Sequence, residues 1–67
     1  MELHACKIRL NDDQILTCRT VEQSLTLMEE MKEGAISHIE IDATDGHRIH
    51  TYTLMDYEES IESLMNL

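Results

Sequence analysis

Residues 3–19, LHACKIRLNDDQILTCR, contain two alternating segments joined by a short polar turn. Alternation of apolar and polar residues is typical of strands that bury one face. The NDD sequence at residues 11–13 predicts the turn, since short Asx side chains bond to their own backbone and tolerate the left-handed region. The stretch therefore predicts a β-hairpin.

The length of this turn fixes which side chains share a face. A three-residue turn sets Ile8 opposite Leu16 and Cys6 opposite Cys18, so that one face of the hairpin becomes apolar. A two-residue turn sets Arg9 opposite Leu16 and mixes apolar with charged side chains. We therefore predict the three-residue turn.

The rest of the chain continues with helices and a second hairpin. Thr20 with Gln23, and Asp56 with Glu59, have the spacing of capping boxes that open helices. Gly34 is expected to end the first helix as its C′ residue. The expected elements are strands at 3–10, 14–19, 35–42 and 47–54, and helices at 21–33 and 57–66.

The second hairpin is predicted to turn at residues 44–46, with Gly46 supplying a positive φ. A three-residue loop there sets Ile41 opposite Ile49 on the core face. The same register sets Asp42 opposite Arg48 on the other face, which is a favourable cross-strand pair.

These elements predict one small α+β domain over residues 1–67. Its order is ββαββα, with a four-stranded, mostly antiparallel sheet and both helices on one face. The strand order 2-1-3-4 satisfies the right-handed crossover through the first helix.

Composition excludes several classes of function. Only 3% of the 67 residues are aromatic and the net charge is −9, which argues against direct binding to nucleic acid or to an anionic membrane. No apolar run approaches the roughly 20 residues of a membrane span, and the start lacks a signal peptide's apolar segment. Without an export signal we expect the chain in the cytoplasm, with its thiols reduced.

Charge is distributed unevenly over the predicted layers. The helices and their caps hold eight acids against Lys32 alone, whereas the open sheet face carries four cations against Glu40 and Asp42. Acids three or four residues apart on a helix lie about 5–6 Å apart, a spacing similar to that of consecutive phosphates. The predicted partner-binding residues are Asp56, Glu58, Glu59 and Glu62 of the second helix and Asp12 and Asp13 of the first turn.

These acids favour a protein-binding module, an inhibitor or regulator that imitates nucleic acid and docks on a basic nucleic-acid enzyme. In size and charge alone, the chain is similar to phage-encoded inhibitors of DNA repair and defence enzymes. The alternative interpretation of the acids is an ordinary solvated surface.

A second hypothesis is a homodimeric structural or accessory protein that uses the open sheet face. So small a domain is marginal alone, and a contact there would bury apolar side chains. The residues expected to point outward on this face include Leu3 and Ile15. The predicted dimer-interface residues are Ile36, His38, Tyr52 and Leu54.

Metal, cofactor and catalytic sites have weak support in the sequence. His4, Cys6 and Cys18 fall together on the predicted core face, but they lack a fourth ligand and zinc-site spacing. A second loose set, His38, Glu40 and His50, is predicted on the opposite face. The serines have no flanking nucleophile motif, and two glycines cannot form a phosphate-binding loop. We therefore expect no cofactor and no enzymatic activity.

Overall fold

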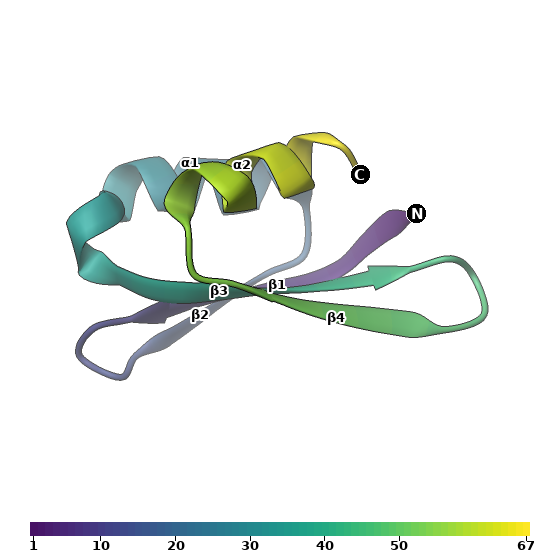
Figure 1. The fold of residues 1–67 in the computed structure, drawn as a ribbon, viewed down its shortest axis with the longest axis horizontal. Coiled ribbons are helices and arrows are strands. Elements are labelled where there is room, and N and C mark those ends of the chain that lie inside the picture. The colour runs from purple at the N-terminus through teal and green to yellow at the C-terminus, as the bar shows by residue number, and fades with distance from the viewer.

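The computed structural model describes residues 1–67 and has the predicted two-layer α+β architecture, with both helices on one face of the sheet (Figure 1). The sheet is antiparallel throughout, in the order β2-β1-β3-β4. Neither helix has the length and apolar character needed to cross a membrane. The elements are β1 (Glu2–Leu10), β2 (Ile15–Cys18), α1 (Val21–Met31), the 3-10 helix η1 (Glu33–Ala35), β3 (Ile36–Thr44), β4 (Ile49–Leu54) and α2 (Tyr57–Met65).

The first hairpin has the predicted register. Cys6 lies opposite Cys18 and Ile8 lies opposite Leu16, so the three-residue turn is confirmed. Asp13 takes the left-handed backbone conformation in this turn, with a φ of 70°. Short Asx residues tolerate that conformation better than most, which explains why the NDD sequence closes the hairpin.

Both predicted N-caps are present. The Thr20 hydroxyl accepts a hydrogen bond from the Gln23 amide at 3.0 Å, and Asp56 Oδ1 accepts one from the Glu58 amide at 2.9 Å. The predicted end of the first helix is wrong by two residues, because Lys32 and not Gly34 takes the positive φ. Gly34 lies in η1, which continues directly into β3.

A buried serine follows each N-cap by four residues. The hydroxyl of Ser24 donates to the Thr20 carbonyl, and that of Ser60 donates to the Asp56 carbonyl, each at 2.8 Å. Both serines are fully buried, and these bonds satisfy hydroxyl groups that would otherwise be costly to bury. The two halves of the chain therefore share this device as well as their order of elements.

The predicted register of the second hairpin is wrong. Ile41 lies opposite Tyr52, three residues beyond its predicted partner, and Asp42 lies opposite Thr51 instead of Arg48. The cause is a four-residue loop, Asp45 to Arg48, in place of the three-residue loop. Because the shift is an odd number, every side chain of β4 moves to the other face of the sheet.

Two β-bulges change which face of the sheet the neighbouring side chains occupy. An extra residue, His4, interrupts the β1 ladder between Leu3 and Ala5, and Ser37 is the extra residue in β3 opposite Arg9 and Leu10. Such bulges shift the alternation by one residue. Leu3 and Ile36 consequently pack against the core instead of pointing outward, and His4 is exposed.

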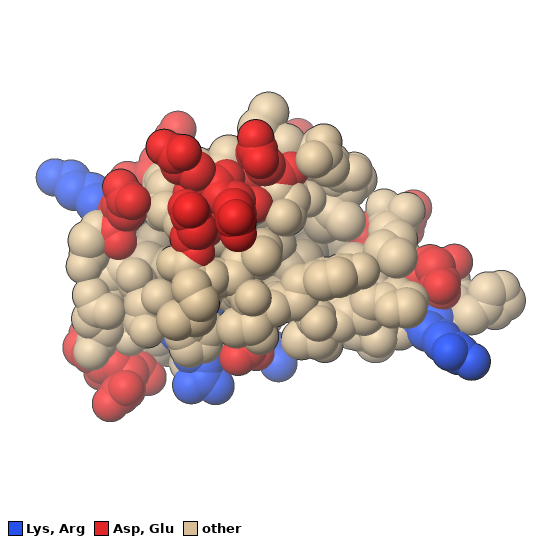
Figure 2. Space-filling model, in the orientation of Figure 1, with Lys and Arg blue, Asp and Glu red and all other residues tan.

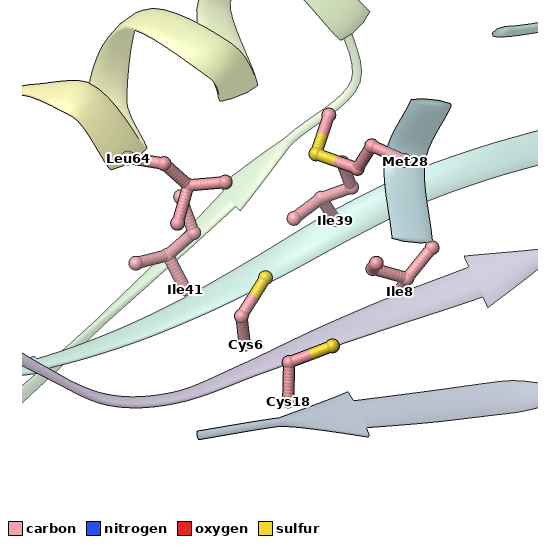
Figure 3. Close-up of a cluster of buried hydrophobic side chains, with 7 residues drawn as sticks. All are labelled: Cys6, Ile8, Cys18, Met28, Ile39, Ile41 and Leu64. Atoms are coloured by element: carbon pink, nitrogen blue, oxygen red, sulfur yellow. The ribbon is translucent and has the colours of Figure 1, made fainter. Parts of the chain in front are cut away.

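The core lies between the sheet and the helices. Met28 of α1 and Leu64 of α2 meet the apolar face of the three strands beneath them (Figure 3). Met65, the last residue of α2, is 69% exposed, because Leu64 and Ile61 occupy the inner side of the helix. The fully buried cluster consists of Cys6, Ile8, Cys18, Met28, Ile39, Ile41 and Leu64.

Candidate protein-binding surface

The helix layer carries a concentrated negative charge without internal neutralisation. Figure 2 shows acidic side chains gathered over the helices, with basic ones at the periphery and underside. The three close ionic contacts of the chain are Arg9–Glu40, His38–Glu40 and His50–Asp45, and none involves a helix or its cap. The unpaired exposed acids of this layer are Glu22, Glu29, Glu30, Glu33, Asp56, Glu58, Glu59 and Glu62.

Only some of these acids stabilise the helices that carry them. Glu58 and Glu59 lie in the first turn of α2, where negative charge interacts favourably with the helix dipole. Glu29 and Glu30 instead lie near the C-terminus of α1, whose last turn has no basic residue. Negative charge there opposes the dipole, so helix stability alone does not explain the distribution of acids.

The predicted partner-binding residues occupy two separate places on the surface. The four acids at the start of α2 are exposed and adjoin one another. Asp12 and Asp13 are exposed in the β1–β2 turn, which is attached to η1. There Asn11 donates from its side chain to the Gly34 carbonyl at 2.7 Å and from its backbone to Ala35 at 3.0 Å.

A groove opens where the two helical segments approach the sheet. It has a volume of about 530 Å³ and lies between η1 with the start of β3 and the end of β4 with the start of α2. Its lining residues are Glu33, Ile36, His38, Ile39, Leu54, Met55, Asp56, Tyr57 and Ser60. Alternation and helical periodicity do not predict this groove; the signal in the sequence is Met55, an apolar residue directly before the cap at Asp56.

The predicted dimer-interface residues do not form a patch on the open face. Ile36 and Leu54 pack against the core, and Tyr52 lies opposite the buried Ile41 on the helix-bearing side. Tyr52 remains 46% exposed on that side. Only His38 stays on the open face, where it is opposite Arg9 in the ladder.

The open face is also less basic than predicted. Lys7 lies opposite Glu40, and the Arg9 Nε atom is 3.5 Å from Glu40 Oε1. Arg48, expected on this face, lies in the β3–β4 loop, and Arg19 follows the last residue of β2. Acids and cations are therefore mixed across the face. Of the apolar side chains predicted to point outward there, only Ile15, opposite Arg9 and 46% exposed, does so.

Neither predicted metal set is assembled. His4 is exposed at the β1 bulge, whereas the Cys6 and Cys18 side chains are fully buried. His50 lies opposite Ala43, on the other face from Glu40, and its Nε2 atom is 3.4 Å from Asp45 Oδ2. No cluster of three His, Cys, Asp or Glu side chains has an arrangement suited to a metal ion.

The two cysteines lie side by side as free thiols in the core. Burial raises the pKa of both Cys6 and Cys18, and the nearby hydroxyl of Ser24 has a smaller, opposite effect. A raised pKa keeps the thiols protonated near neutral pH, which makes them poor nucleophiles and poor metal ligands. They serve as small apolar residues that fill the core.

The functional assignment therefore depends on the geometry and charge of this surface. No family of proteins, no curated protein and no solved structure matches the chain.

Proposed function

We propose that the protein is a small acidic binding module that inhibits or regulates a partner protein. The partner would carry a basic surface of the kind that binds nucleic acid. The observation that supports this proposal is the set of eight exposed helix-layer acids, none of which pairs with a cation of the same chain. Charges left free in this way remain available to a partner.

The electrostatics of this layer suit fast, specific association. A concentrated patch of one sign steers a complementary partner and raises the association rate, an effect that salt suppresses. Acids three or four residues apart, such as Glu58 and Glu62, lie about 5–6 Å apart along a helix. A row of acids at this spacing can occupy a groove that normally holds phosphates.

The first experiment identifies the partner and the second tests the acidic surface. Affinity purification from a native lysate, followed by mass spectrometry, supplies the partner. The double variant Glu58→Gln/Glu62→Gln then removes two like charges on one face of α2 without touching the cap. We expect its association rate to fall and its salt dependence to become shallower. Its melting temperature should change little, because relief of the repulsion between Glu58 and Glu62 offsets the loss of a favourable charge in the first turn of α2.

The control is Glu2→Gln, which removes one exposed charge from the start of β1. Its association rate is compared with that of the single variant Glu58→Gln, which removes one charge from α2. Unchanged association rate and salt dependence in the double variant would exclude α2 as the recognition surface. The acids of the helix layer would then be an ordinary solvated surface.

A further inference from the structure

We propose that the groove beside α2 is the docking site for one arginine side chain of the basic partner. This inference rests on the proposed function and specifies the chemical group that the acidic surface recognises. The groove combines an apolar wall, an aromatic ring and two carboxylates, and no cation of this chain is paired with either carboxylate.

The groove exists because β4 stops short of the first residues of β3. The β3–β4 ladder stops at Leu54, which lies opposite Ile39. The first residues of β3, from Ile36 to His38, therefore have no β4 neighbour, since the chain leaves the sheet at Met55 to begin α2. On the other side, η1 places Glu33 at the rim.

The walls of the groove match the long stem of arginine. Ile36, Leu54 and Met55 provide apolar contact, and Met55 is 74% exposed and lies outside the core cluster. The volume of about 530 Å³ lies within the roughly 300–1,000 Å³ of typical small-ligand sites, so one side chain fits with space for its neighbours.

The polar groups match the planar head of arginine. Asp56 uses Oδ1 to cap α2, which leaves Oδ2 free to accept a second bond, and Glu33 makes no ion pair within the chain. Tyr57 lines the same groove, and a guanidinium group stacks on aromatic rings. Arginine offers five donors in a fixed plane, whereas lysine is a strongly hydrated point charge.

A direct test uses the whole protein and small probes by NMR. N-acetyl-arginine amide should shift the methyl signals of Met55, Leu54 and Ile36 in a saturable way at millimolar concentration. N-acetyl-citrulline amide has the same shape without the charge, and it should give no saturable shift. Glu33→Gln should weaken arginine binding about threefold to fivefold, as expected for an exposed ion pair.

The control Glu2→Gln removes an equal charge from the start of β1, outside the helix layer, and should leave binding unchanged. Met55→Ala tests the apolar wall at an exposed site and should also weaken binding. Equal binding of citrulline, stronger binding of N-acetyl-leucine amide, or shifts spread over all helix acids instead of the groove would each overturn the inference.

Rates measured in the partner complex distinguish failure of the groove from failure of the acidic surface. In the partner complex, Glu33→Gln and Met55→Ala should raise the dissociation rate, whereas Glu58→Gln/Glu62→Gln should lower the association rate. If the second effect occurs without the first, and the arginine probe does not bind, the acidic surface is the recognition site and the groove is not.

Discussion

The hydroxyl of Tyr57 donates a hydrogen bond to the backbone carbonyl of Met28 at 3.3 Å, and this bond connects the start of α2 to the last turns of α1. The same carbonyl accepts the amide of Lys32, which caps the helix. Tyr57 thereby fixes the position of α2 relative to the end of α1.

The Tyr57→Phe variant should lower the free energy of unfolding by about 0.5–1 kcal/mol, at the lower end of the range for one hydrogen bond. The loss is small because the Met28 carbonyl keeps the Lys32 amide as a partner. Urea denaturation measures it. A loss of several kcal/mol would show that the ring, and not the hydroxyl, had been disturbed.

The cysteine side chains should resist alkylation in the folded protein. Cys6 and Cys18 are fully buried, and burial raises the pKa of both thiols. Iodoacetamide should therefore modify them only when the chain opens, which mass spectrometry with and without urea detects.

The same experiment contains an internal check. If modification requires global opening, Tyr57→Phe should accelerate it by the factor by which the variant reduces the folding equilibrium constant. Rapid modification of either thiol in the native protein would contradict its burial.

Acids at opposite ends of α1 should have opposite effects on stability. Glu30→Gln removes negative charge near the C-terminus and should raise the free energy of unfolding by a few tenths of a kcal/mol. Glu22→Gln removes it from the first turn and should lower the free energy by a similar amount. Thermal unfolding at low salt compares them. Equal effects would show that net charge, and not the helix dipole, dominates.

Lowering the pH toward 2 should destabilise the conformation of the β3–β4 loop. The backbone amides of Arg48 and His47, with the side chain of His50, lower the pKa of Asp45 from 3.8 to about 2. Because the pKa is lower in the folded state, the stabilisation is complete above the ordinary value and is lost as pH falls toward 2.

The variant Asp45→Asn should therefore be less stable than the natural chain at pH 7, and the difference should close near pH 2. Urea denaturation across this range measures the difference, with Glu2→Gln as the control for loss of one exposed acid. Parallel behaviour of the two variants would show that the loop carboxylate has no special role.

The parts of the fold that were predictable depend on interactions between near neighbours. The first hairpin followed from its turn and from the pairing of Ile8 with Leu16, and both helix starts followed from their N-caps. The exposure of the acids on α2 was likewise predictable, because helical periodicity alone places Ile61 and Leu64 inward.

The second hairpin was not predictable from alternation, because one side chain determines its loop. Asp45 Oδ1 accepts hydrogen bonds from the amides of both His47 and Arg48 at 2.9 Å, which favours four loop residues over three. The groove depends on this register, since the predicted pairing would have set Leu54 opposite Ile36 and covered the start of β3.

The central ladder also determines how the chain reaches its native state. Ile8 and Ile39 are adjacent in the sheet although more than thirty residues separate them in sequence. Hairpins form locally within roughly 1–10 μs. Joining β1 to β3 requires closing a long loop, and the entropy of closure is lost before contacts between the strands can stabilise the pair. We therefore expect the joining of β1 to β3, and not the formation of either hairpin, to limit the rate of folding.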